Sequence, residues 1–241
     1  MSGRATLLMY HSIGKRNEYF FNVSLENFSL QMQYLFDHGY QIISLRDLLE
    51  RLRDGKKLNG EIVITFDDGY KDNLEQAFPV LERLNFPATI FMTTNLIGLK
   101  DKRGFEMLSA ADLVTLVNSD LIEIAPHTSS HPKLAKLSRI EAIKEIQDSR
   151  TVLENILRKT CDLFAYPYGN YSTETISILR GLGFLGAITV KEGTVGASDD
   201  LLTLRRNSID RTTSLIQFRG KLTRVVDRYE SIKHAFHGSS L

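Results

Sequence analysis

Short apolar runs rich in Val, Ile, Leu and Phe recur along the whole chain. Most of them are nearly continuous rather than alternating, which is typical of parallel strands that are covered on both faces. We expect strands at residues 6–10, 41–45, 61–66, 88–93, 121–125, 162–166, 186–190 and 202–206.

Amphipathic stretches with helix start signals lie between these runs. The expected N-caps are Ser24, Ser109, Ser138 and Ser172. The first of these helices is expected to end at Gly39, and its apolar stripe to be Phe28, Met32, Leu35 and Phe36. Strands that alternate with helices indicate βαβ units and a parallel sheet or barrel. In such folds chemistry gathers at the C-terminal ends of the strands.

Composition fits one globular domain. The chain has 241 residues, of which 42% are hydrophobic and 24% charged. This length is common for a single α/β barrel, so we expect one domain over residues 1–241 with its core at about 5–220. A formal net charge of +1 without a long basic run argues against a nucleic-acid partner. The one cysteine, Cys161, excludes an internal disulfide framework and a cysteine zinc site.

Targeting signals are absent from the sequence as it stands. No apolar segment approaches the ~18 to 20 residues of a transmembrane helix, and the N-terminal apolar run is too short for a signal peptide. The expected location is therefore cytoplasmic, or extracellular or periplasmic if an export signal has been removed.

Two adjacent aspartates, Asp67 and Asp68, follow the apolar run at 61–66. Neighbouring carboxylates disfavour each other's ionisation. A helix cap or turn explains one aspartate and leaves the second without a role. A bound cation explains both, because one carboxylate binds it while the other stays free to accept a proton.

Two histidines, His127 and His131, follow the expected strand at 121–125. Taken alone, such a pair is more often structural. Together with the aspartates it supplies an Asp/His/His set that leaves coordination positions open for water and substrate. Neutral imidazoles suit transition metals, so we expect a divalent cation, Zn²⁺ first, with Co²⁺ or Ni²⁺ as alternatives.

Two further strand ends carry candidate residues. In "FAYPYGNYS", Pro167 and Gly169 force a special backbone path around Tyr168, either as a rigid turn or to aim a backbone N–H at a developing oxyanion. His11 follows the first strand and is the candidate proton donor, although a lone histidine there is usually structural. His234 and His237, near the C-terminus, are expected to face solvent.

The motifs "TFDDGY", "HTSSHP" and "YPYG" resemble those of the NodB-homology polysaccharide deacetylases, carbohydrate esterase family 4. The likeness runs from about residue 5 to residue 220. "LMYHSIG" is similar to the branch that deacetylates poly-N-acetylglucosamine, in which the catalytic-histidine motif precedes the paired aspartates. The resemblance implies a distorted (β/α)7 barrel and a metal-dependent hydrolase that removes N- or O-acetyl groups, most often N-acetyl groups, from a carbohydrate substrate.

The resemblance also implies a role for each motif residue. Asp68, His127 and His131 would bind the metal, Asp67 would be the general base, His11 the general acid, and the Tyr168 backbone N–H an oxyanion donor.

The sequence departs from the family pattern at Ala165, where many members carry an arginine that pairs with the base. Arg206 resembles a late-strand arginine of some relatives and is the candidate replacement, with a sheet-end salt bridge as the alternative. His11 also needs a carboxylate neighbour to stay protonated beside a cation, and Asp210 and Asp199 are the candidates.

Three other functions stay open. A glycosidase needs two carboxylates on separate elements, which the adjacent aspartates fit poorly. A non-catalytic carbohydrate-binding relative is favoured only by Ala165. A metal-dependent amidase or deformylase acting on a small molecule or glycolipid is possible because related barrels share the scaffold.

Overall fold

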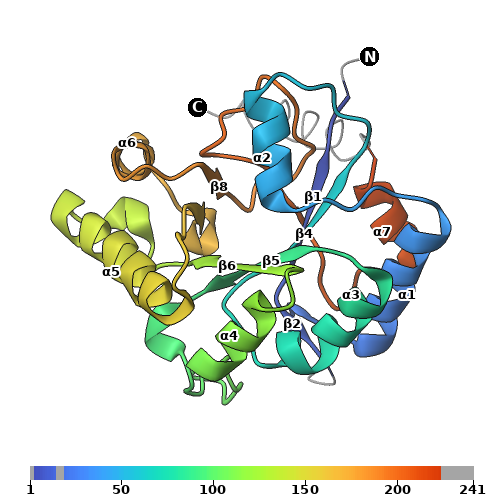
Figure 1. Ribbon diagram of the computed structural model, residues 1–241, viewed down its shortest axis with the longest axis horizontal. Coiled ribbons are helices and arrows are strands. Elements are labelled where there is room, and N and C mark those ends of the chain that lie inside the picture. The colour runs from blue at the N-terminus through green and yellow to red at the C-terminus, as the bar shows by residue number, and fades with distance from the viewer. Residues whose placement is uncertain (1–2, 15–18, 224–241) are drawn as a thin grey trace, which may run out of the picture.

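A computed structural model describes residues 3–14 and 19–223 of the chain. Its central element is a five-stranded parallel sheet in the order β6-β5-β4-β1-β9 (Figure 1). The strands are β1 (Thr6–Tyr10), β4 (Ile62–Phe66), β5 (Ala88–Met92), β6 (Ile122–Pro126) and β9 (Asn207–Ser208). A separate short pair joins β2 (Ser12–Ile13) to β3 (Asn22–Val23).

Two further strands continue the sheet into a distorted barrel. β7 (Leu163–Ala165) lies against β6 and pairs in parallel with β8 (Gly186–Ile188). Ile188 of β8 forms a parallel bridge with Leu204, and the chain then enters β9, which pairs with β1. The predicted α/β barrel is thereby confirmed, with strands that share one direction.

Helices surround the strands (Figure 1). They are α1 (Leu25–Asp37), α2 (Leu45–Arg53), α3 (Phe78–Leu84), α4 (Ala110–Val117), α5 (Arg139–Leu157), α6 (Thr173–Gly181) and α7 (Leu215–Lys221). The caps predicted from sequence all accept a backbone N–H at a helix start: Ser24, Ser109, Ser138 and Ser172. Shorter helical turns are Asn73–Ala77, Thr94–Leu96, Leu134–Lys136 and Pro167–Gly169.

Two of the expected strands are reduced to single bridges. In the run at 41–45 only Ile42 pairs, through a bridge to Ile62, because the Ser44 hydroxyl accepts the Asp47 N–H at 3.0 Å and starts α2. In the run at 202–206 only Leu204 bridges, and regular pairing begins at Asn207.

The expected stripe of α1 is also corrected at one position. Phe36 is 54% exposed, because it lies a step around the helix from buried Leu35. The fourth buried residue of this helix is Gln31, which accepts a 2.7 Å hydrogen bond from the Tyr10 hydroxyl. A polar residue at a core position is not recognised by apolar periodicity.

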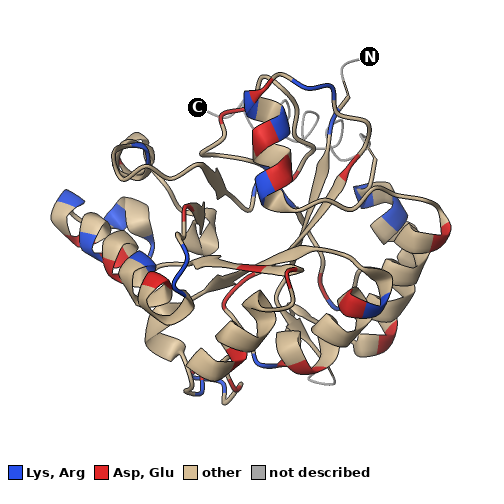
Figure 2. Ribbon diagram, viewed as in Figure 1, with Lys and Arg blue, Asp and Glu red and all other residues tan. Residues whose placement is uncertain are grey.

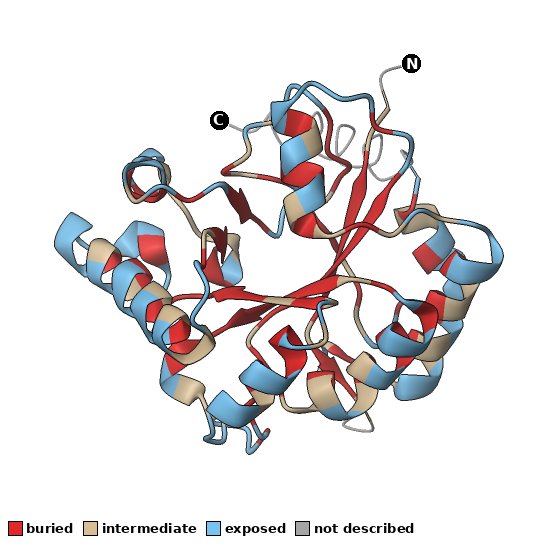
Figure 3. Cartoon of the chain, in the orientation of Figure 1, coloured by how far each residue is buried: buried red, intermediate tan, exposed pale blue. Residues whose placement is uncertain are grey.

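Burial follows the layers of the fold. The strands are almost entirely buried, and the helices expose their outer faces (Figure 3). Charged residues gather on those outer faces, for example along α2 and α5 (Figure 2). No helix in the described part of the chain is long and apolar enough to cross a membrane.

Candidate active site

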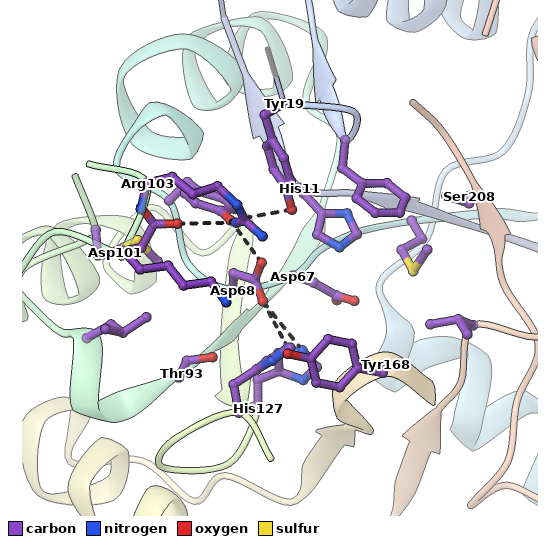
Figure 4. Close-up of a pocket in the computed structure, with 18 of the residues that line it drawn as sticks. His11, Tyr19, Asp67, Asp68, Thr93, Asp101, Arg103, His127, Tyr168 and Ser208 are labelled. Atoms are coloured by element: carbon purple, nitrogen blue, oxygen red, sulfur yellow. Dashed lines mark hydrogen bonds and ion pairs between the residues drawn. The ribbon is translucent and has the colours of Figure 1, made fainter. Parts of the chain in front are cut away.

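A cavity of about 670 Å³ opens at the C-terminal ends of the strands (Figure 4). The sequence-predicted residues that line it are His11, Asp67, Asp68, His127, His131 and Tyr168. Arg206 lies behind this lining and is fully buried. The fold therefore brings together the residues that the sequence motifs predict for the site.

Strand register explains why these side chains meet. Tyr10 pairs with Phe66, so the residues that follow them, His11 and Asp67, emerge side by side. Met92 likewise pairs with Pro126, and the His127 N–H donates to the Met92 carbonyl at 2.9 Å. Parallel strands in register thus deliver residues distant in sequence to one edge.

Asp68, His127 and His131 form a compact donor set, with ligand atoms within 4.8 Å of one another. The Asp68 Oδ1 atom lies 3.3 Å from His131 Nε2 and 3.7 Å from His127 Nε2. Donor atoms about 2.0–2.2 Å from a tetrahedral Zn²⁺ lie roughly 3.4 Å apart. The two Asp68–histidine distances are close to this spacing, so the three residues fit a divalent transition metal, and they do not by themselves select which one.

The His127 ring is held in the tautomer that a metal ligand needs. Its Nδ1 lies 2.7 Å from the Ala165 carbonyl oxygen, which can only accept, so Nδ1 carries the proton and Nε2 presents its lone pair to the cavity. Burial lowers the pKa of His127 to about 4, which keeps the ring neutral near pH 7.

Asp67 is paired with Arg206 in the barrel interior. The two guanidinium nitrogens Nη1 and Nη2 donate to Oδ1 and Oδ2 of Asp67, each at 2.7 Å. Arg206 also donates from Nε to the Thr189 carbonyl at 2.9 Å and from Nη1 to the Thr65 hydroxyl at 3.0 Å. Burial acts to raise the pKa of Asp67, but the Arg206 charge and hydrogen bonds outweigh it and hold that pKa well below its usual range.

Ala165 carries no charge, and the charge beside Asp67 comes from Arg206 instead. Ala165 contributes its backbone carbonyl to His127, while Arg206 reaches Asp67 from the segment before β9. Of the two readings left open by the sequence, the contact with Asp67 is the one that the geometry favours.

A second set of contacts, which sequence reasoning missed, surrounds Asp68. The Tyr70 hydroxyl donates to Asp68 Oδ2 at 3.0 Å, and Arg103 Nη1 lies 3.4 Å from the same hydroxyl. Burial raises the pKa of Tyr70 far above its usual range, so the hydroxyl stays protonated. Tyr70 belongs to the quoted motif "TFDDGY", which was the available signal, whereas nothing in the sequence pointed to Arg103.

Glu145 of α5 fixes the loop between the two histidines and was also missed. Its Oε2 accepts the backbone N–H groups of Ser129 and Ser130, both at 2.9 Å, and its Oε1 accepts the Ser130 hydroxyl at 2.6 Å. The loop needs such support because His131 has a positive φ of 62°, an uncommon conformation for a non-glycine residue.

His11 reaches the cavity, but its expected carboxylate partner is not there. Within the described residues, His11 Nδ1 is buried without a hydrogen-bond partner, and the ring stacks on Phe21 with centroids 4.6 Å apart. Asp199 instead pairs with Arg4 at 3.1 Å, and Asp210 accepts the Thr212 N–H at 2.8 Å.

This arrangement corrects the expectation that a carboxylate neighbour keeps His11 protonated. Burial lowers the pKa of His11, against the smaller raising effects of Asp68 and Asp67. The other two histidines singled out from the sequence, His234 and His237, lie outside the described residues.

Tyr168 stands at the cavity mouth with a left-handed backbone, φ 58°. Its ring is 56% exposed and lies edge-on to His131, with centroids 4.5 Å apart. The next residue must be glycine, because Gly169 has φ 61° and a Cβ there would come within 2.9 Å of the Val190 backbone nitrogen. The turn therefore holds the Tyr168 peptide in one orientation beside the metal-ligand candidates.

Comparison with known proteins gives a consistent result. The sequence model of the family described as polysaccharide deacetylase matches residues 54–187. YxkH of Bacillus subtilis, which is named as a polysaccharide deacetylase, is 31% identical over 201 residues, covering 83% of this chain and 69% of that protein. A poly-beta-1,6-N-acetyl-D-glucosamine N-deacetylase of Staphylococcus aureus is 27% identical over 213 residues, covering 79% of this chain and 73% of its own.

A solved structure is similar over nearly the whole length. The deacetylase PplD of Streptococcus pyogenes, in complex with acetate, superposes with a TM-score of 0.84 and 25% identity. The match covers 92% of this chain and all of that one. The likeness in fold therefore extends over most of this chain.

Proposed function

The chain belongs to the polysaccharide deacetylase family, and on that premise we propose that it removes N-acetyl groups from a polymer of β-1,6-linked N-acetylglucosamine. The enzyme class, a hydrolase of carbon–nitrogen bonds other than peptide bonds, follows from the family. The particular polymer is taken from the Staphylococcus aureus relative, and the early position of His11 is the feature of this chain that supports it.

The observation that carries the proposal is the Asp/His/His donor set beside an arginine-paired aspartate. Asp68, His127 and His131 would hold a divalent cation, with Zn²⁺ as the first candidate. When bound, such a cation supplies Lewis acidity, which makes water more acidic and polarises a carbonyl group.

The remaining steps belong to the chain's own residues. Asp67, ionised and held by Arg206, accepts a proton from the attacking water. The Tyr168 backbone N–H donates to the oxyanion that develops on the acetyl carbonyl. Burial lowers the pKa of His11, so this residue must take up a proton before it can give one to the departing sugar amine, which becomes the free amino group of the product.

Two alternatives fit the site less well. A glycosidase would need two carboxylates on separate elements, but Asp67 and Asp68 are adjacent in the chain and Asp68 faces two histidines. A carbohydrate-binding relative without activity was favoured by Ala165 alone, and Arg206 supplies the charge that Ala165 lacks.

Acetate release from a panel of acetylated glycans tests the proposal. The panel should contain β-1,6-linked and β-1,4-linked N-acetylglucosamine oligomers, an O-acetylated polysaccharide and a small formamide. We expect release from the β-1,6-linked oligomer, loss of release after chelation, and recovery with Zn²⁺ or Co²⁺. Turnover of the formamide alone would assign the protein to the small-molecule amidases. Activity that survives chelation would show that the reaction does not need the metal.

A further inference from the structure

The two carboxylate oxygens of Asp68 have different partners. Oδ1 faces the imidazole nitrogens of His131 and His127 at 3.3 and 3.7 Å. Oδ2 accepts a hydrogen bond from the Tyr70 hydroxyl at 3.0 Å. A carboxylate on a single-bonded side chain can rotate, so the bond to Oδ2 decides which oxygen Asp68 turns toward the histidines.

The Tyr70 hydroxyl is itself fixed in place. The residue is 1% exposed, and its backbone pairs with Met107 in an antiparallel bridge. The same strand-like contact continues on both sides, through a 2.9 Å bond from Lys71 N–H to the Glu106 carbonyl and a 3.0 Å bond from Leu108 N–H to the Gly69 carbonyl. The segment from residue 98 to 108 therefore supports the turn that carries Asp68.

Arg103, at the tip of that segment, contacts the same hydroxyl. Its Nη1 lies 3.4 Å from the Tyr70 oxygen and 3.3 Å from Asp101 Oδ2, and its guanidinium stacks 4.5 Å over the Tyr19 ring. A hydroxyl that accepts a hydrogen bond from a cation becomes a stronger donor. The Tyr70 hydroxyl also lies 3.5 Å from the Tyr19 hydroxyl, but its 3.0 Å bond to Asp68 is shorter and ends on a carboxylate. The main contacts therefore run from Arg103 to Tyr70 and from Tyr70 to Asp68.

We propose that Tyr70 is a positioning residue that orients Asp68 for metal binding, and that Arg103 strengthens this effect through Tyr70. The inference rests on the proposed metal site. It assigns to the segment 98–108 a part in metal affinity, in addition to its part in lining the cavity.

Metal affinity of the purified full chain tests this inference without substrate. The apo-protein is titrated with Zn²⁺ against a competing chelator, and with Co²⁺ while its visible absorption spectrum is recorded. Tyr70→Phe should weaken binding by about 10- to 100-fold, the usual effect of losing such a supporting contact, and should change the Co²⁺ spectrum. Tyr10→Phe is the matched control, because it removes a buried hydroxyl that bonds Gln31 in the core.

Arg103→Met provides a second, independent variant, since its side chain is partly exposed and its loss should not impair folding. It should weaken Zn²⁺ binding by a few-fold, and Tyr70→Phe combined with Arg103→Met should be no weaker than Tyr70→Phe alone. Unchanged Zn²⁺ affinity in either single variant would overturn the inference. A wild-type protein that binds neither ion would instead overturn the proposed function, so the two failures are distinguishable.

Discussion

Arg206 and Asp67 lie 139 positions apart in sequence and join in a bidentate, fully buried ion pair. The pair spans the barrel from the segment before β9 to the end of β4. It fixes the orientation of Asp67 and keeps its carboxylate ionised. Such a pair is costly to break, because removing one partner leaves the other charged, buried and without compensation.

Substituting Arg206 is therefore expected to affect stability in a pH-dependent way. Arg206→Met should lower the free energy of unfolding by about 3–5 kcal/mol at pH 7. In the wild type the pKa of Asp67 is lower in the folded state than in the unfolded chain, where it is about 4. The pair therefore stabilises the fold fully above about pH 4, and this stabilisation is lost as the pH falls from there through the lowered pKa of the folded state. In the variant, burial without a partner raises the pKa of Asp67, so protonation relieves the penalty on acidification.

Urea unfolding at pH 7 and pH 4 measures this difference. The difference in the free energy of unfolding between wild type and Arg206→Met should be smaller at pH 4 than at pH 7. The neighbouring Arg205 is exposed, and Arg205→Met serves as the control with little expected change at either pH. If this difference in free energy were the same at both pH values, Arg206 would not act by stabilising the charge of Asp67.

The support of the histidine loop by Glu145 is expected to matter for metal retention. Glu145→Ala removes the acceptor of two backbone N–H groups in the segment between His127 and His131. Zn²⁺ affinity should fall by about 10- to 100-fold. Asp148, on the same helix, pairs with the exposed Lys144, so Asp148→Ala should leave the affinity unchanged. Equal affinities for both variants would show that the loop holds its shape without α5.

The loss of activity in His11→Ala should depend on the leaving group of the substrate. An amide needs a proton on the departing amine, whereas an activated aryl ester has a leaving group that departs without one. We therefore expect kcat to fall by ~10² to 10⁴ for an N-acetylated sugar, and much less for an aryl acetate, with metal content unchanged. A similar loss for both substrates would make His11 a structural residue that fills the space beside Phe21.

The positions of most strands along the chain and the identity of the strand-end residues could be predicted from local patterns, since apolar runs and capping serines act over a few positions. The partner of Asp67 needed a resemblance to relatives, because Arg206 follows no local rule and meets Asp67 only through barrel closure. The same holds for Arg103 and Glu145, whose contacts depend on how a loop and a helix fold back over the strand ends. Among the described residues His11 Nδ1 has no hydrogen-bond partner, and this could not be predicted because an absent contact has no sequence signal.

The central claim is that Asp67 is the general base and Asp68 a metal ligand. Asp67→Asn tests it most directly. The measurement is acetate release from a β-1,6-linked N-acetylglucosamine oligomer by this variant, with bound metal determined on the same sample. We predict a full complement of metal and a rate lower by ~10² to 10⁴, the usual contribution of a positioned general base. Asp68→Asn, measured alongside, should lose the metal, because it alters one of the three ligand candidates. Loss of metal from Asp67→Asn with retention in Asp68→Asn would contradict the account by exchanging the two roles.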